Sequence, residues 1–343
     1  VEWVIADLAI LTAGAVAVAI SETASAADID WILRDSGARG VFVGEPEIFA
    51  RVTAGRSETG FDFLFAFHKA VRLIDELDTG GLSLLRLENL GREQGAVACV
   101  DARVAAINPT DLMTLIYTSG TTGQPKGVMI SHHNMVVNCQ ACLRAISIHS
   151  DDVLLSFLPL SHSFERMAGY YMPALFGGAT IYYSEGLDRL IEDIAEVRPT
   201  LMTGVPRLYE KIYSRVQEMR LQSGSIRRVA MDAALSVGAR MTRRQQSGRQ
   251  AGKALTWQYE WLRDKIFKGL HERLGGRLRL LVSGGAPLAP EIAEFFYSSG
   301  ILILEGYGLT ETSPVVSVNR PAAYRFGSVG KPLDNVRVRI AED

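Results

Sequence analysis

Short apolar runs alternate along the chain with longer segments in which apolar residues recur every three or four positions. The short runs are typical of strands and the longer periodic segments of helices. Because the runs are continuous, without a polar residue at every second position, they predict strands buried on both faces in parallel sheets. The predicted strands are Ala15–Ile20, Gly40–Val43, Leu112–Thr118, Val153–Phe157, Thr180–Tyr183, Leu278–Val282 and Ile301–Glu305.

The segments between these strands predict helices that cross from one strand to the next. They are Ala27–Ser36, His133–Ile146, Glu165–Phe176, Leu187–Val197 and Glu291–Ser299. The repetition of strand and helix predicts an α/β fold of mostly parallel sheets flanked by helices, with right-handed crossovers.

The first segment, Val1–Ile20, is apolar enough to suggest a membrane span at first sight. Glu2 and Asp7 interrupt it, and a membrane span tolerates buried charge poorly. We therefore expect a core helix that leads into a buried strand.

Two stretches lack a clear period. Thr79–Arg103 is rich in glycine and charge and is expected to cross the surface between subdomains, while Met241–Ala251 predicts a solvated connection between helices. After it, Lys253–Leu274 carries one apolar stripe, which predicts a helix buried on one side. We expect subdomains of roughly 1–110 and 111–343, with a helical insertion at about 219–275.

The chain has 343 residues, beyond the roughly 250–300 at which a single core stops growing. Its 48% hydrophobic and 22% charged residues exclude disorder, and its formal net charge of −2 gives no support to nucleic-acid binding. The segment Arg220–Lys253 differs: it has eight basic residues and one acid, so it carries +7 and the rest of the chain −9. This basic segment is interpreted either as a solvated helical surface or as a site of attraction to an anionic membrane surface.

The three cysteines are Cys99, Cys139 and Cys142. This odd, sparse count argues against a disulfide framework and favours a reducing cytoplasm. Cys139 and Cys142 form a C-x-x-C within a predicted helix, without a second pair that would complete a zinc site. Buried helix thiols are the preferred interpretation over a metal or redox site.

The segment Tyr117–Gly127, YTSGTTGQPKG, joins glycines, hydroxyls and one lysine directly after a predicted strand. Exposed amides, hydroxyls and a lysine suit a polyphosphate. The nearest general motif is the Walker A loop, but Pro125 stands where its second glycine would be and Gly127 where its Ser or Thr would be. A strand, Val128–Ser131, follows in place of a helix. A P-loop NTPase is therefore a poor fit.

Three further segments occur in a fixed order after this loop: LPLSHSFER (158–166), SGGAPL (283–288) and EGYGLTET (305–312). Together with YTSGTTGQPKG they resemble the signatures of the adenylate-forming enzymes, a superfamily that includes acyl-CoA synthetases. The resemblance covers essentially the whole chain. It implies that a carboxylic acid and ATP form an acyl-adenylate and pyrophosphate, and that the adenylate then forms a thioester with coenzyme A.

The resemblance also implies a set of site residues. The residues implied to bind phosphate are Thr118, Ser119, Gly120, Thr121, Thr122, Gly123 and Lys126. The adenine and acyl pockets fall to Gly284, Gly285, Ala286 and Pro287, and further nucleotide contacts to Glu305, Gly306, Tyr307, Gly308 and Thr310. The catalytic residues implied are Thr118, His162 and Glu311.

Two of these roles also make chemical sense from the residue types. Glu311 and Thr118 offer hard oxygen ligands, and the resemblance assigns both to Mg²⁺-ATP. His162 is placed beside the reacting carboxylate, where it positions the substrate. Attack by a carboxylate removes no proton, so a general base is not required for the first step.

Within the superfamily, SHSFER, then VPRLYEKIYSRV (205–216) and the long helical insertion resemble long-chain fatty-acyl-CoA synthetases. Some of these carry a tryptophan gate four positions after the histidine; Arg166 stands there, so the gate does not carry over. Members that activate amino acids usually place an aspartate here for the substrate ammonium. The stretch is instead mostly apolar and aromatic, although Glu165 keeps another acid open as an alternative.

The family continues beyond EGYGLTET with an aspartate that holds the ribose, a hinge, and a C-terminal domain with a lysine used in adenylation. This sequence ends at Asp343, soon after GSVGKPL. We therefore expect the large N-terminal domain alone, trimmed also at its own N-terminus, with weak nucleotide binding and little or no turnover. A non-catalytic nucleotide- or lipid-binding module, a homodimer and peripheral membrane contact stay open.

Overall fold

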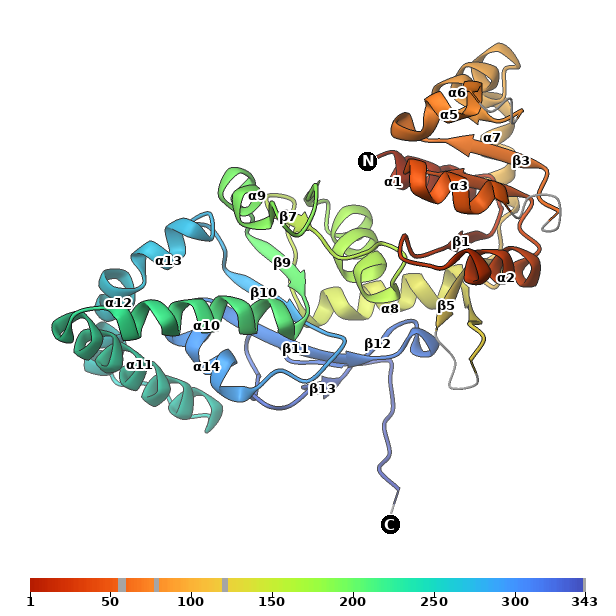
Figure 1. Cartoon of the computed structure of the whole chain (residues 1–343). Coiled ribbons are helices and arrows are strands. Elements are labelled where there is room, and N and C mark those ends of the chain that lie inside the picture. The colour runs from red at the N-terminus through yellow and green to blue at the C-terminus, as the bar shows by residue number, and fades with distance from the viewer. Residues whose placement is uncertain (55–59, 77–79, 119–122, 342–343) are drawn as a thin grey trace. The chain divides into compact units, whose positions relative to one another are not determined.

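The computed structural model describes residues 1–54, 60–76, 80–118 and 123–341. The chain separates into two compact units, Val1–Val136 and Val137–Asp343, and each is described by itself. Figure 1 labels their elements. The boundary between the units lies between residues 136 and 137, and the expected subdomain boundary near residue 110 stays a prediction.

Within the described residues of the first unit, the strands form two three-stranded sheets in the orders β1-β5-β6 and β2-β3-β4. All neighbours are parallel except β6, which returns antiparallel to β5. The strands are β1 (Ala17–Ala19), β2 (Gly40–Val43), β3 (Phe63–Ala66), β4 (Leu82–Ser83), β5 (Leu112–Thr118) and β6 (Lys126–Ser131). The helices are α1 (Glu2–Thr12), α2 (Ala26–Ser36), α3 (Pro46–Ala54), η1 (His68–Ala70), α5 (Val71–Glu76), α6 (Leu84–Glu93) and α7 (Val97–Ala106).

The second unit is built on a seven-stranded sheet in the order β13-β12-β11-β10-β9-β7-β8. Its strands from β8 to β11 are parallel, and β12 and β13 are antiparallel. They are β7 (Val153–Ser156), β8 (Thr180–Tyr183), β9 (Leu201–Gly204), β10 (Leu280–Ser283), β11 (Leu302–Gly308), β12 (Val315–Val318) and β13 (Lys331–Pro332). Every residue of β9 and β10 is buried, which places these strands at the centre of the sheet.

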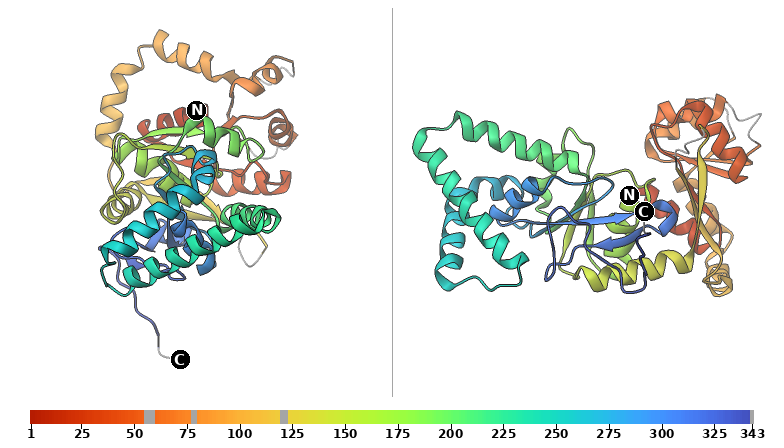
Figure 2. Two further views of the ribbon diagram at one scale, coloured as in Figure 1. Left: turned by 90° about the vertical axis from the view of Figure 1, so that its left-hand side faces the viewer. Right: turned by 90° about the horizontal axis from the view of Figure 1, so that it is seen from below.

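Helices cover this sheet and form one end of the second unit (Figure 2). The α-helices are α8 (His132–Ala145), α9 (Leu190–Val197), α10 (Pro206–Gln222), α11 (Ser225–Gln246), α12 (Lys253–Ile266), α13 (Lys268–Arg273) and α14 (Pro290–Ser298). Also helical are the π-helix η2 (Glu165–Phe176) and the 3₁₀ turn η3 (Thr310–Thr312). The core centres on α14, where Phe296 meets Tyr209 of α10 edge to face, with ring centroids 5.9 Å apart.

The α/β fold expected from the sequence is confirmed, and most predicted elements appear within a few residues of their expected ends. Val1–Ile20 forms a helix and a short strand, as expected, and no helix among the described residues has the length and apolarity to cross a membrane. Burial on both faces holds for β9 and β10 but not for β8, whose residues alternate between exposed and half-buried.

Three predictions about irregular or helical stretches were wrong. The segment Thr79–Arg103 is not irregular: α6 and α7 form most of it, with a turn at 94–96, because the Ser83 hydroxyl caps α6 and strong helix formers follow. Its described residues are exposed or half-buried, and a crossing between subdomains stays a prediction. Only the second half of Met241–Ala251 connects two helices, because α11 continues to Gln246, with Thr242 buried. The single helix expected at Lys253–Leu274 divides into α12 and α13 where the Phe267 ring enters the core.

A buried aspartate ties together the beginnings of three parallel strands. Asp152 precedes β7, and its carboxylate accepts hydrogen bonds from Arg279 Nη2 at 2.6 Å, from Thr200 Oγ1 at 2.6 Å and from the His149 backbone N–H at 2.9 Å. Thr200 precedes β9 and Arg279 precedes β10. Burial acts to raise the pKa of Asp152, but these hydrogen bonds outweigh it and hold the pKa below its ordinary value.

We predict that Asp152→Asn lowers the free energy of unfolding near neutral pH by about 1–3 kcal/mol, because it removes a buried, charged acceptor from three hydrogen-bond donors. Since the pKa of Asp152 is lowered in the folded state, its stabilisation is present above the ordinary aspartate pKa of about 3.9 and is lost as the pH falls through the folded value. Urea unfolding midpoints of both proteins should therefore converge in acid. Glu218→Gln, in an exposed pair on α10, is the control; an equal loss there would contradict the prediction.

Candidate active site

Three of the four motifs lie in the second unit, and the sheet brings them to one edge. SGGAPL follows β10 and EGYGLTET begins in β11, and these neighbouring parallel strands pair Ser283 with Glu305. LPLSHSFER follows β7 in the same sheet. Because parallel strands end at the same edge, their following loops converge there, which is where α/β sheets bind ligands.

Direct contacts join the three motifs at this edge. The hydroxyls of Ser163 and Thr310 are hydrogen-bonded at 3.0 Å. The Phe164 ring covers Gly284 so closely that a Cβ at 284 would lie 2.9 Å from a ring carbon. His162, next to Ser163, is exposed, and its backbone N–H donates to the Pro159 carbonyl at 3.0 Å. The predicted catalytic histidine is therefore held by its backbone while its ring is free to meet a ligand.

The SGGAPL turn presents backbone to solvent. Gly285 has φ +83°, a left-handed conformation that favours glycine, and it is exposed together with Ala286 and Pro287. Behind the turn, the Ser283 hydroxyl is buried without a hydrogen-bond partner among the described residues. The turn thus combines open backbone amides with an unused polar group, which suits the ligand contacts predicted from the sequence.

Glu305 has a structural task in this site. Its carboxylate is buried and accepts from the backbone N–H groups of Leu288 at 3.3 Å and Gly327 at 3.1 Å. Burial raises its pKa. The carboxylate holds the end of the SGGAPL turn against β11, and the nucleotide contact expected for Glu305 stays a prediction.

The remaining residues of EGYGLTET present their side chains outward. Tyr307 is 48% exposed, as a ring that stacks on a base would need to be. Gly308 is forced to be glycine, because a Cβ there would lie 2.0 Å from the Pro314 carbonyl oxygen. Gly306 meets no such obstruction. Glu311, in the turn η3, is exposed, and among the described residues its carboxylate forms no ion pair.

The phosphate-loop motif lies in the first unit, between β5 and β6. Thr118 ends β5 and pairs with Lys126, which begins β6 with an exposed side chain. Gly123 has φ +94°, again in the left-handed region. Four of the predicted phosphate-binding residues lie outside the described residues: Ser119, Gly120, Thr121 and Thr122.

The described ends of this loop are fixed by aromatic side chains. The Tyr117 hydroxyl donates to Asp35 at 2.6 Å, and its ring lies so close to Gly127 that a Cβ there would approach it to 3.0 Å. The Trp31 indole N–H donates to the Pro125 carbonyl at 3.0 Å. Gly127 is therefore explained by the Tyr117 ring, whereas the sequence explained it by backbone approach to a ligand.

Sequence reasoning considered Glu165 only as an acid that kept another substrate open, and the structure gives it a structural role behind the site. Its side chain is fully buried, with Ser156 Oγ donating at 2.6 Å and Thr203 Oγ1 at 2.7 Å, and the Leu158 backbone N–H also donates to it. Burial raises its pKa to about 7. Glu165 therefore joins β7, β9 and the loop that carries His162. A lone acid in an apolar run was the only signal for it in the sequence.

Gly169, one helical turn after Glu165, makes room for this carboxyl group. A Cβ at position 169 would lie 2.4 Å from Glu165 Oε1. Next to this pair, Arg166 is fully buried, with its guanidinium 5.5 Å from the Tyr171 ring centroid and its Nε donating to the Tyr171 hydroxyl at 2.9 Å. Arg166 is therefore part of the buried scaffold behind the loop.

We predict that Gly169→Ala destabilises the protein by about 1–3 kcal/mol, because the added methyl group displaces the Glu165 carboxyl group from its donors. Gly269→Ala on α13 is a matched control: a Cβ there meets nothing within 4 Å, and alanine favours a helix over glycine. Chemical unfolding of both variants is the measurement. Equal stabilities for the two would show that the close approach at Gly169 has no cost.

A second prediction concerns the pH dependence of Glu165. Its pKa is raised from 4.5 to about 7, so the unfolded chain loses this proton at a lower pH than the folded protein does. Stability should fall as the pH rises from 4.5 to about 7, and Glu165→Gln should remove that fall, which amounts to about 3 kcal/mol. Urea unfolding across this range, with Glu210→Gln on α10 as an exposed control, measures it. Parallel pH profiles for wild type and Glu165→Gln would contradict the prediction.

Comparison with known proteins shows which family this chain matches. The family described as AMP-binding enzyme matches residues 1–343, the whole chain. Long-chain-fatty-acid–CoA ligase FadD15 of Mycobacterium bovis is 34% identical over 345 residues, covering 100% of this chain and 55% of that protein. Long chain acyl-CoA synthetase 6, peroxisomal, of Arabidopsis thaliana is 35% identical over 235 residues, covering 68% of this chain and 32% of that protein.

Solved structures support the same fold. Anthranilate CoA ligase AuaEII in complex with anthranoyl-AMP superposes with a TM-score of 0.66 at 20% identity, covering 100% of this chain and 54% of that chain. Long-chain-fatty-acid-CoA ligase FadD1 of Archaeoglobus fulgidus gives 0.61 at 18% identity, covering 97% of this chain and 55% of that chain. The chain spans about half the length of the curated relatives it matches over its whole extent. With a family match at every residue and relatives above 30% identity, the chain belongs to the AMP-binding enzyme family.

Proposed function

We propose that the longer protein containing this chain activates a long-chain fatty acid with ATP. The products are an acyl-adenylate and pyrophosphate, and then acyl-CoA and AMP. The observation that carries the proposal is the convergence of three motifs at one sheet edge, joined by the Ser163–Thr310 hydrogen bond. A relative named as a long-chain-fatty-acid–CoA ligase, 34% identical over the whole chain, supports it.

In this proposal, an oxygen of the fatty-acid carboxylate attacks the α-phosphorus of ATP, a new P–O bond forms, and the bond to pyrophosphate breaks. The work of the protein is to bind, orient and neutralise charge. The exposed turn after Ser283 and the ring of Tyr307 hold the nucleotide, and Lys126 compensates phosphate charge. His162 orients the carboxylate, because no proton has to be removed in this step.

Magnesium fits the donors that the chain offers. Glu311 is an exposed carboxylate without an ion-pair partner among the described residues. In the same residues, no group of three or more His, Cys, Asp or Glu side chains could hold a metal ion by itself. Mg²⁺ usually takes one or two carboxylates together with substrate phosphates. Glu311 would hold the ion, which neutralises charge on the phosphates. The motif resemblance implies the Thr118 hydroxyl as a further ligand.

The surroundings of His162 favour an acid without an ammonium group. Glu165, the acid that left amino-acid activation open, is fully buried, and both of its oxygens accept hydrogen bonds from the protein. Its complete burial and these internal hydrogen bonds favour a structural role over binding of a substrate ammonium. Most of η2, which follows, is buried and apolar. Long chain length rests on the motif resemblance and on the names of the relatives.

Two further expectations concern the surroundings of the protein. Cys139 and Cys142 are buried thiols in α8, and burial raises the pKa of each to about 12, which supports a structural role; a reducing cytoplasm stays a prediction from the cysteine count. The basic segment Arg220–Lys253 supports peripheral contact with an anionic membrane. A homodimer stays a prediction.

Pyrophosphate exchange that depends on an added carboxylic acid tests the proposed activity. We expect the full-length protein to exchange labelled pyrophosphate into ATP with long-chain fatty acids and much less with aryl or amino acids. Exchange with an aryl or amino acid alone would favour the adenylating ligase for another acid. ATP binding without exchange for any acid would favour the non-catalytic module.

We predict that Glu311→Gln lowers the exchange rate of the full-length protein at least about 100-fold, because the substitution removes a charged ligand of Mg²⁺-ATP. The Mg²⁺ concentration needed for half-maximal rate should rise as well. Glu192→Gln, on the exposed side of α9, should leave both quantities unchanged. If Glu311→Gln kept the wild-type exchange rate and Mg²⁺ dependence, Glu311 would not be a ligand of the metal ion.

A further inference from the structure

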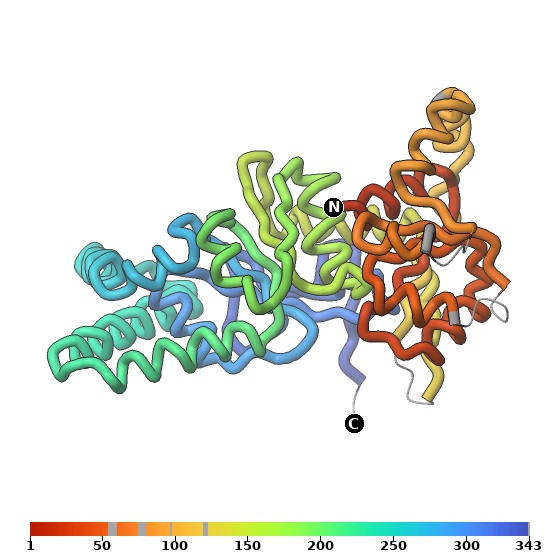
Figure 3. The backbone as a smooth tube through the Cα atoms, turned by 45° about the horizontal axis from the view of Figure 1, so that its top comes forward, coloured from red at the N-terminus to blue at the C-terminus, as the bar shows by residue number. Residues whose placement is uncertain are grey.

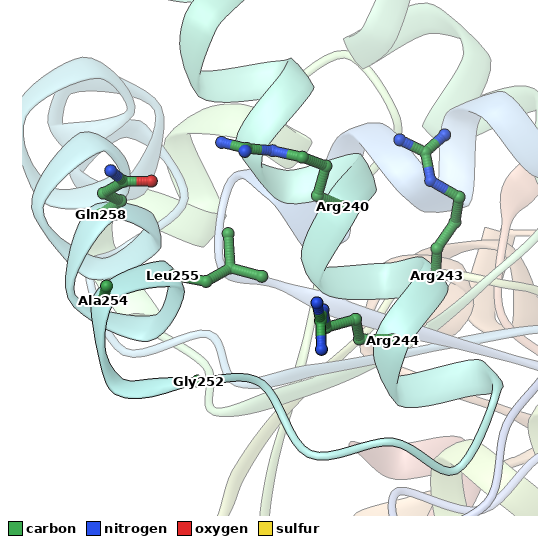
Figure 4. Close-up of a pocket in the computed structure, with 7 residues that line it drawn as sticks. All are labelled: Arg240, Arg243, Arg244, Gly252, Ala254, Leu255 and Gln258. Atoms are coloured by element: carbon green, nitrogen blue, oxygen red, sulfur yellow. The ribbon is translucent and has the colours of Figure 1, made fainter.

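A basic groove lies between helices α11 and α12, which run side by side in the second unit (Figure 3). Its volume is about 590 Å³, in the range of small-molecule sites. Arg240 and Arg244, from the C-terminal part of α11, project toward the start of α12, which closes the groove, while the Arg243 side chain extends from the other side of α11 (Figure 4). The lining residues are Arg240, Arg243, Arg244, Gly252, Ala254, Leu255 and Gln258.

The arginines of this groove have no acidic partner. Among the described residues, neither an ion pair nor a side-chain hydrogen bond is formed by Arg240, Arg243 or Arg244. By contrast, Arg220 at the other end of the basic segment is paired with Asp232. Two unpaired guanidinium groups that face one groove, with that of Arg243 on the neighbouring side of the same helix, are suited to an anion with several oxygens, because guanidinium binds phosphate in a bidentate manner.

Large apolar side chains are exposed beside the groove. On α12, Trp257 and Trp261 are 64% and 51% exposed and stack with ring centroids 6.4 Å apart. Ala254, Gln258 and Trp261 follow each other at spacings of four and three, so the tryptophans continue the stripe that lines the groove. Tryptophan combines an apolar body with a polar N–H and is enriched at membrane–water interfaces.

Helix α11 shows the same combination of apolar and basic exposure. Ile226 and Val229 near its start are 87% and 65% exposed. Val229 lies three helical turns before Arg240, on the same outward face. The hairpin of α11 and α12 therefore exposes aliphatic, aromatic and cationic groups together, which is typical of helices that lie in the interfacial layer of a membrane.

We propose that the basic groove binds the phosphate headgroup of an anionic phospholipid, with Trp257 and Trp261 entering the interfacial layer beside it. A free phosphate would satisfy the arginines but would leave Ile226, Val229 and both tryptophans in water. A membrane surface satisfies all of these groups at once. This proposal rests on the peripheral membrane contact proposed above and names the residues that would make it. It does not depend on whether the protein activates fatty acids.

Vesicle sedimentation of the full-length protein tests the site. Wild type should pellet with phosphatidylcholine vesicles that contain phosphatidylglycerol and stay in solution with phosphatidylcholine alone, and added salt should weaken binding. Replacing Arg240, Arg243 and Arg244 together by Gln should reduce the partition coefficient roughly 100-fold. Changing Arg86, Arg92 and Arg103, exposed in the first unit, to Gln removes the same charge and should have little effect.

Tryptophan fluorescence gives a second readout. Two of the four tryptophans in this chain, Trp257 and Trp261, are proposed to enter the lipid layer. Their emission should therefore shift to the blue on vesicle binding and be quenched by brominated lipid. The double variant Trp257→Phe/Trp261→Phe should lose both responses. Melting curves confirm that each variant is folded. If the two triple variants lost vesicle binding equally, net charge alone would explain binding, and the proposed site would be wrong. Stabilisation by inorganic phosphate without vesicle binding would overturn the lipid in favour of a soluble phosphate, and pyrophosphate exchange, measured separately, would be unaffected by either result.

Discussion

The parallel pairing of β9, β10 and β11 is the constraint on which the candidate site depends. These strands start together and run in the same direction, so the segments at their carboxyl ends reach the same edge of the sheet, although they are far apart in sequence. At the opposite edge, Asp152 holds the beginnings of β7, β9 and β10 in register. The sheet fixes the positions of the site residues, because the loops that carry them are short and are joined by contacts such as the Ser163–Thr310 hydrogen bond.

Much of the scaffold was accessible from the pattern of apolar residues, because long or strongly apolar segments bury a face whatever their partners are. Gly40–Val43, Leu112–Thr118 and Thr180–Tyr183 were predicted with the bounds the structure gives them, although Thr180–Tyr183 has no fully buried residue. Leu201–Gly204 was not predicted, because a four-residue strand containing Thr and Gly has too little local signal and is defined by its two neighbours. The same holds for β12, which depends on antiparallel pairing with β11.

Local motifs predicted candidate residues for the site, but they could not predict the contacts that arise from packing. The glycines of the motifs, His162 and Glu311 could be singled out from their sequence context. The part played by Glu165 could not, because its hydroxyl partners Ser156 and Thr203 lie nine and 38 residues away and reach it only through the sheet. Nor could the clamp of Glu305 on two distant backbone amides be read from a motif that suggests a nucleotide contact.

The close approach of Gly169 to the Glu165 carboxyl group has a consequence for substitutions at either position. A side chain at 169 and a carboxyl group at 165 compete for the same space. A large residue at 169 would fit only beside a shorter residue at 165, and this chain would then lose the link that Glu165 makes between two strands and the histidine loop. The two positions are therefore coupled, and their substitutions are expected to be non-additive.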